Sequence, residues 1–152
     1  LHAANITRGG EWLETRILSS GPRTNPWMQE CSSRKIQSGE LMAFDTDLIG
    51  TYGICVDISR TWLCGDQPAT AEQKEIYSMA HEQIIRNTDF LKPGMSYYDL
   101  THKSFQYDPD EFRHYGCIYH GVGLCDEAPA IWFPSAWEEY GYDGHLEPGM
   151  VI

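Results

Sequence analysis

Three aspartates, Asp45, Asp47 and Asp57, stand in the stretch FDTDLIGTYGICVDISRTW, which otherwise consists mainly of residues that suit β-strands. Successive side chains of a strand point to opposite faces, so Asp45 and Asp47 share one face, about 7 Å apart. If the chain reverses near Gly50, Asp57 lies on the neighbouring strand and reaches the same patch. A divalent cation such as Mn, Fe or Zn would offset the repulsion between these carboxylates. Alternatively, the aspartates flank a turn and face water, because turns favour Asp.

A second candidate group for chemistry stands in YHGVGLCDEAP, which contains His120 and Asp126. A lone histidine is more often structural than a metal ligand. Together with the aspartates, however, His120 makes a set of oxygen and imidazole donors that suits a borderline divalent metal.

The elements that must position these groups can be read from the sequence. Residues 41–49 and 52–64 are rich in β-formers and predict a hairpin around Gly50. Residues 70–91 predict a helix, which Thr70 caps and Pro93-Gly94 ends. Ser96 and Asp99 form a second capping box, which opens a helix to about residue 105.

The remaining segments are less regular. DPDEFRHYG could open a short third helix, IYHGVGLCDEAPAIW reads as strand plus loop, and EWLETRILSS fits either a helix or a strand. The order of hairpin, helices and strands predicts an α+β fold, with helices packed on one side of a mostly antiparallel sheet.

Composition excludes several classes of protein. The 152 residues are enough for one domain with a core, and the formal net charge of −11 argues against a nucleic-acid partner. No apolar run is long enough for a transmembrane helix. The five cysteines include no Cys-x-x-Cys pair, which favours reduced thiols and a cytoplasmic location. The chain starts at Leu1 and stops in a β-branched run, so we expect it to be a fragment of a longer protein.

The motifs DTDLIGTYGICVDISRTWLCG and YHGVGLCDEAP resemble those of the creatinase/aminopeptidase metalloenzymes, which have the pita-bread fold. The family pattern is an Asp before a Gly-Tyr turn, Asp-x-Ser/Thr-Arg-Thr, His-Gly-x-Gly and His-Glu-x-Pro. By position, Asp57 and His120 match metal ligands. The resemblance implies a dinuclear metal site completed by two glutamates beyond Ile152. Residues 1–152 would then be part of a single pita-bread catalytic domain, without its N-terminal domain and its C-terminal ligand strands.

The chain departs from the peptidases of this family at three positions. The usual first ligand stands eleven residues before the second, where this chain has Thr46 between its two aspartates. Peptidases also carry two histidines around the substrate that are not ligands, and the matching residues here are Met28 and Asp126. A peptidase that lacked these two histidines would lose the side chains that help to bind and polarise the peptide carbonyl.

One branch of the family, the metal-dependent dimethylsulfoniopropionate (DMSP) lyases of the DddP type, is similar at these positions and in the opening NITRGGEWLETRILSSGPRTNPWMQE. This resemblance implies that Asp45 and Asp47 are both metal ligands, together with Asp57 and His120. It also implies that the metal is iron, with zinc or manganese as alternatives, and that Asp126 is the catalytic base.

The chemistry of DMSP cleavage accounts for these residue types. The β-elimination to dimethyl sulfide and acrylate removes a proton beside the carboxylate, so it needs a base and a group that stabilises the developing charge. Aromatic faces attract the sulfonium cation. Tyr115 is the expected substrate contact, because the lyase branch also has a Tyr five residues before the His. We expect most of the neighbouring aromatic residues to pack in the core.

The sequence therefore favours a cytoplasmic DMSP lyase that acts on a small molecule, has no nucleic-acid or membrane partner and is a homodimer when full length. One alternative is an Xaa-Pro dipeptidase or aminopeptidase of the same fold, against which Met28 and Asp126 argue. The other is a pita-bread module that has lost catalysis and binds proteins, which has no reason to keep Asp47, Asp57 and His120 together.

Overall fold

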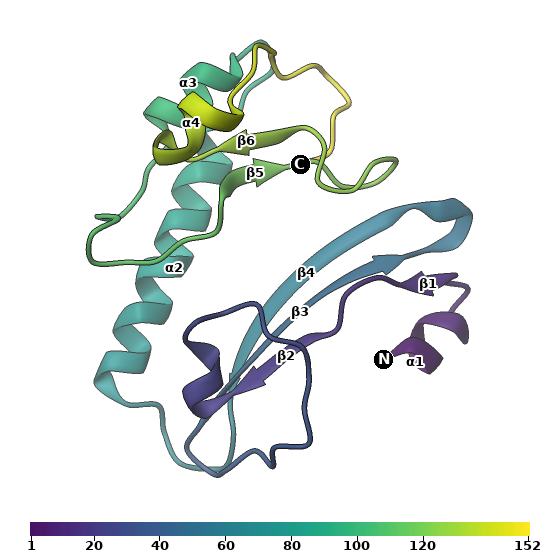
Figure 1. Ribbon diagram of the computed structural model, residues 1–152, viewed down its shortest axis with the longest axis vertical. Helices are drawn as coiled ribbons and strands as arrows, with labels where there is room; N and C mark the ends of the chain where they lie inside the picture. The colour runs from purple at the N-terminus through teal and green to yellow at the C-terminus, as the bar shows by residue number, and fades with distance from the viewer. The chain divides into compact units, whose positions relative to one another are not determined.

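A computed structural model describes residues 1–152, and the chain divides into two compact units. Unit 1 comprises residues 1–70 and 122–126, and unit 2 comprises residues 71–121 and 127–152. Figure 1 shows the elements of each unit along the chain. No helix has the length and apolar character that crossing a membrane requires.

Unit 1 is built on an antiparallel sheet of four strands (Figure 1). Its long central strand β3 (Leu41–Ile49) pairs on one edge with β4 (Cys55–Leu63) and on the other with β1 (Trp12–Leu13) and β2 (Ile17–Ser20). The sequence left residues 11–20 open between helix and strand, and the structure makes them two short strands. Their inward residues Leu13 and Ile17 are buried.

The predicted hairpin is confirmed as β3 and β4. Gly50 donates its N–H to the carbonyl of Ile54 at 2.7 Å, and a 3-10 turn (η2, Thr51–Gly53) reverses the chain. Tyr52 has a φ of 63°, a left-handed conformation that is uncommon for a residue with a side chain. The reversal fixes which residues of the two strands face each other.

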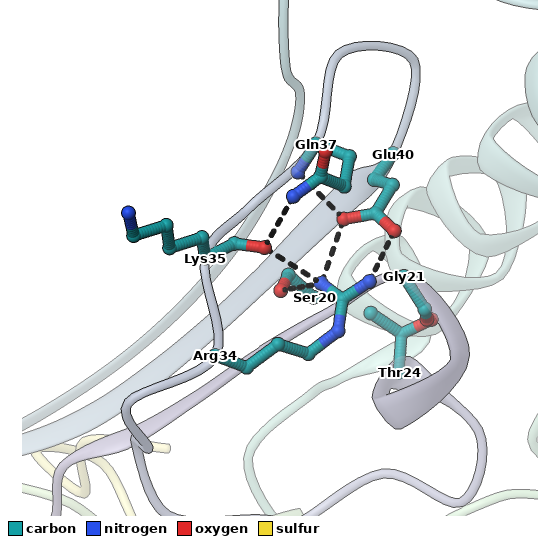
Figure 2. A network of polar contacts seen from close by, with 7 residues as sticks. All are labelled: Ser20, Gly21, Thr24, Arg34, Lys35, Gln37 and Glu40. Atoms are coloured by element: carbon teal, nitrogen blue, oxygen red, sulfur yellow. Dashed lines mark hydrogen bonds and ion pairs between the residues drawn. The ribbon is translucent and has the colours of Figure 1, made fainter.

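An ion pair orders the loop before β3 (Figure 2). The Arg34 guanidinium makes two hydrogen bonds to the Glu40 carboxylate and a third to the Ser20 hydroxyl, at 2.8 Å. The backbone N–H of Gln37 also donates to Glu40, at 2.8 Å. The loop is thereby attached to the end of β2, beside a short 3-10 helix (η1, Gly21–Thr24) that lies in the predicted loop of residues 20–27.

Unit 2 contains the helices α2 (Ala71–Phe90), α3 (Tyr97–Lys103) and α4 (Pro134–Tyr140) and the antiparallel strands β5 (Cys117–His120) and β6 (Ala130–Trp132). The helices α2 and α3 confirm the predictions. At the start of α3 the Ser96 hydroxyl accepts a hydrogen bond from the N–H of Asp99 at 3.0 Å. The core consists of Tyr97, Leu100, Tyr119, Ile131 and Leu146.

Three features of the fold differ from the sequence predictions or were missed by them. DPDEFRHYG forms a turn and no helix, because the Asp108 side chain accepts from the N–H of Asp110 and the backbone continues for only one turn. The short helices α1 (His2–Ile6) and α4 were not predicted. The α+β class and the antiparallel sheet are confirmed. The four-stranded sheet lies in unit 1 and the helices α2, α3 and α4 lie in unit 2, so the packing of helices on one side of the sheet stays a prediction.

Candidate metal centre

The hairpin register brings two of the candidate carboxylates face to face. Asp47 of β3 pairs directly with Asp57 of β4, and Asp45 pairs with Ser59. Side chains of directly paired residues point to the same face, with Cβ atoms about 5 Å apart. Because Asp45 lies two residues before Asp47, all three carboxylates lie on one face of the hairpin, as predicted.

Asp47 lies in an environment that disfavours its charge. Its side chain is buried, at 8 % exposure. The pKa of the Asp47 carboxyl is raised to about 6: burial is the largest cause, the hydrogen bond from Thr15 opposes it, and the negative charges of Asp57, Asp126 and Asp45 add to the rise. A bound cation would reverse this balance.

Hydroxyl groups orient two of these carboxylates. Thr15 donates its hydroxyl proton to Asp47 Oδ2 at 2.6 Å, and Ser59 donates to Asp45 Oδ1 at 2.5 Å. Sequence reasoning missed both residues as parts of the site. Ser59 could have been found, because it stands two residues after Asp57 on a predicted strand and so shares its face. Thr15 could not, because its segment had no assigned secondary structure.

Thr46 stands where the peptidases carry their first ligand, and the structure shows why it is no substitute. Its side chain points to the face opposite Asp45 and Asp47, is 2 % exposed and donates a hydrogen bond to the Thr15 carbonyl at 2.9 Å. The aspartates on either side of it therefore supply the carboxylates of this strand.

The loop that carries Asp126 belongs to the same unit as the aspartates. Gly123 and Cys55 exchange two backbone hydrogen bonds, of 2.7 and 3.0 Å, which attach this loop to the start of β4. Burial raises the pKa of the Cys55 thiol, and the carboxylates of Asp126 and Glu14 add to the rise. Asp126 Oδ1 is buried and has no hydrogen-bond partner. An unpartnered buried carboxylate oxygen is costly, so it marks a place where a ligand or substrate is expected.

His120 lies in unit 2 at the end of β5. The preceding residue, Tyr119, is buried and makes hydrogen bonds to Ser104 at 2.8 Å and to the Asn87 carbonyl at 3.2 Å, which fixes this strand against α2 and α3. His120 Nδ1 lies 3.2 Å from the Gly121 carbonyl. In the tautomer with its proton on Nδ1, Nε2 is the ring nitrogen that can accept a hydrogen bond or bind a metal.

Gly121 is required by the loop that follows. A Cβ on Gly121 would lie 2.0 Å from the Ala128 carbonyl oxygen, because the chain returns to give a hydrogen bond from Gly121 N–H to the Pro129 carbonyl at 2.9 Å. The first glycine of the His-Gly-x-Gly motif therefore serves the close return of the backbone.

Tyr115, the predicted substrate contact, lies in unit 2 and is 46 % exposed. Its hydroxyl is 3.5 Å from Glu127 Oε1. Of the other aromatic residues near the second motif, Tyr119 lies in the core and Trp137 packs against it, as expected. Tyr140 contacts Trp132 but is 51 % exposed, so it does not belong to the core.

The residues of unit 1 fit a cation. Their oxygen donors suit a hard or borderline divalent metal, and the burial of Asp47 beside like charges leaves a deficit of positive charge that a metal would fill. No group of three or more His, Cys, Asp or Glu side chains has the arrangement of a formed metal site. The assignment therefore rests on the chemistry of the donors.

Comparison with known proteins identifies a family of metalloenzymes. The pattern of metallopeptidase family M24 matches residues 1–152. The chain belongs to this family. It is 54 % identical over 153 residues to the "Dimethylsulfoniopropionate lyase DddP" of Roseovarius nubinhibens, and 50 % identical over 155 residues to the protein of the same name from Roseobacter denitrificans. Both alignments cover 100 % of this chain and 34 % of the relative, so this M24 chain spans about a third of the length of these curated relatives.

A solved structure of the family shares the fold. The "Prolidase from Pyrococcus furiosus" superposes with a TM-score of 0.74 at 29 % identity, over 95 % of this M24 chain and 42 % of the prolidase. This match and the family pattern confirm the pita-bread fold. The resemblance of the two motifs to DddP-type proteins is also confirmed.

Proposed function

We propose that this M24 protein cleaves DMSP to dimethyl sulfide and acrylate by β-elimination. The observation that carries the proposal is the position of Asp126, which stands where the family peptidases have a histidine. Its loop is attached to the hairpin by backbone hydrogen bonds, and its negative charge raises the pKa of Asp47. The identity of 54 % to a protein named as a DMSP lyase supports it further.

In the proposed reaction Asp126 takes a proton from the carbon beside the substrate carboxylate. The electron pair of that C–H bond forms the carbon–carbon double bond, and the C–S bond breaks with its electrons on sulfur. Dimethyl sulfide then leaves as a neutral molecule, so the leaving group needs no acid. The buried, unpartnered oxygen of Asp126 is suited to accepting a proton.

We propose Asp45, Asp47, Asp57 and His120 as metal ligands, with iron as the metal, zinc or manganese as alternatives, and two further glutamates beyond Ile152. When bound, the metal supplies positive charge that stabilises the charge developing on the substrate carboxylate. The position of Asp45, Asp47 and Asp57 on one face of the hairpin supports the choice of these three, and the resemblance to the family motif supports His120. Tyr115 would face the sulfonium.

We further propose that residues 1–152 are part of one catalytic domain, that the full-length protein is a cytoplasmic homodimer, and that its partner is the small molecule DMSP rather than nucleic acid or a membrane. The net charge of −11 supports the absence of nucleic acid.

The test is a headspace assay for dimethyl sulfide with the purified, metal-loaded full-length protein, combined with detection of acrylate. We expect both products in equal amounts. A matched control variant is Asp66→Asn, which removes an exposed carboxylate of unit 1 and should leave the rate unchanged.

The alternative is an Xaa-Pro peptidase, for which the 29 % identity to a prolidase is weaker support than the 54 % identity to a DMSP lyase. In that case the parent protein cleaves Xaa-Pro dipeptides and leaves DMSP intact. Asp126→His, which restores the residue of the family peptidases, would then raise dipeptide cleavage. A parent protein that cleaves dipeptides and releases no dimethyl sulfide ends the lyase proposal.

A further inference from the structure

We propose that Thr15 is a positioning residue of the metal centre, which holds the Asp47 carboxylate in the orientation that binds a cation. The inference rests on the proposed metal site and deepens it, because Thr15 lies outside both sequence motifs and is not itself among the proposed ligands.

The sheet places Thr15 beside Asp47. Residues 14–16 connect β1 with β2, and both of these strands pair with β3 on the edge opposite β4. The connection follows the same edge of β3, and Glu14 donates its N–H to the Asp47 carbonyl at 2.9 Å. Thr15 therefore reaches Asp47 from a segment separate from the hairpin.

Thr15 and Asp47 are joined by two hydrogen bonds. The Thr15 hydroxyl donates to Asp47 Oδ2 at 2.6 Å and accepts from the Asp47 backbone N–H at 2.9 Å. A hydroxyl has a single proton, so this proton is committed to the carboxylate. The backbone of Thr15 is held as well, because the buried Thr46 hydroxyl donates to its carbonyl at 2.9 Å.

This arrangement opposes a movement that electrostatics would otherwise favour. Asp47 lies directly opposite Asp57, and a free carboxylate would rotate away to relieve the repulsion. The bond to Oδ2 prevents this rotation and leaves the lone pairs of Oδ1 for a cation. Groups that orient metal ligands in this way typically change metal affinity about 10–100-fold when they are removed.

The test compares Thr15→Val, which keeps the shape and loses the hydroxyl, with Thr15→Ser, which keeps the hydroxyl. Co²⁺ affinity of the full-length protein is measured by competition with a chelator, and the visible absorption of bound Co²⁺ reports the coordination. We expect Thr15→Val to weaken Co²⁺ binding about 10–100-fold and to change the spectrum. Thr15→Ser should restore both the parent affinity and the parent spectrum.

A matched control is Thr24→Val, which removes a hydroxyl that donates to the Gly21 carbonyl at 2.8 Å in the same unit. Thermal unfolding of each variant identifies a general loss of structure. Unchanged Co²⁺ affinity in Thr15→Val, or an equal loss in Thr24→Val, overturns the positioning role. A parent protein that binds Co²⁺ and shows the expected Thr15 effects but releases no dimethyl sulfide refutes the lyase function alone.

Discussion

Glu40 and Asp47 are two partly desolvated carboxylates of unit 1, and their surroundings shift their pKa values in opposite directions. Glu40, directly before β3, has a side-chain exposure of 18 %. The Arg34 guanidinium, with help from the Gln37 N–H, lowers the pKa of Glu40 to about 2. Asp47, within β3, is 8 % exposed, and burial with three neighbouring carboxylates raises its pKa to about 6.

The difference separates a carboxylate whose charge the fold neutralises from one that is a candidate for binding a ligand. The fold supplies Glu40 with its own counter-charge, and the result is an ordered loop (Figure 2). For Asp47 the fold supplies one hydroxyl and several negative charges. A buried group with a strongly perturbed pKa and like-charged neighbours is a candidate for binding or catalysis, because a ligand must complete its environment.

The largest expected effect comes from the carboxylate proposed as base. Asp126→Asn keeps the shape of the side chain and removes its ability to accept a proton, so DMSP cleavage by the full-length protein should fall about 10²–10⁴-fold. Metal content should stay the same, because Asp126 is not a proposed ligand. Headspace assay of dimethyl sulfide and elemental analysis measure the two quantities. A variant that keeps the parent rate, or loses its metal, contradicts this role.

The second prediction is that Asp47→Asn changes thermal stability in opposite directions without and with bound metal. In metal-free full-length protein at pH 7, Asp47→Asn should raise the thermal unfolding midpoint, because it removes a buried charge whose raised pKa shows that the folded state disfavours it. With metal at 100 times its dissociation constant, the parent should gain about 2.7 kcal/mol of stability and the variant much less. Thermal unfolding with and without metal measures both. If the variant gains as much as the parent, Asp47 is not a ligand.

The smallest expected effect concerns Glu40, the carboxylate that is compared with Asp47. Glu40→Gln should lower the thermal unfolding midpoint at pH 7, because the depressed pKa of Glu40 means that its charged form stabilises the fold. This contribution is present above the ordinary pKa of 4.5 and is lost as the pH falls towards 2, so the parent and the variant should converge in acid. Metal should stabilise both equally.

The control for this prediction is Glu30→Gln, which removes an exposed ion pair of 3.7 Å to Arg16 and should change little. A difference between Glu40→Gln and the parent that is constant from pH 7 to pH 2 would show that the ion pair is not its cause.

The hairpin could be predicted from the sequence because its residues signal the strands locally. Alternating β-formers and the glycines around Tyr52 mark β3, the reversal and β4, and the period of two places Asp45 and Asp47 on one face. The start of α3 was equally readable, because the Ser96 cap depends only on residues a few positions apart.

Features that depend on distant parts of the chain could not be predicted. Thr15 meets Asp47 across 32 positions of sequence, and only the pairing of β1 and β2 with β3 brings them together. The raised pKa of Asp47 likewise depends on burial and on the loop of Asp126. The turn at Asp108 shows the opposite case, in which a local side-chain bond competes with a predicted helix.

The central claim is that Asp45, Asp47 and Asp57 of the hairpin hold metal, and elemental analysis of the full-length protein tests it most directly. The parent, reconstituted with iron, zinc or manganese and freed of excess metal, should retain roughly two ions per chain, as a dinuclear site requires. Asp57→Asn, which removes the charge opposite Asp47, should retain much less, while Glu40→Gln should retain as much as the parent. A parent that retains no metal, or an Asp57→Asn variant that retains the full amount, would contradict the account.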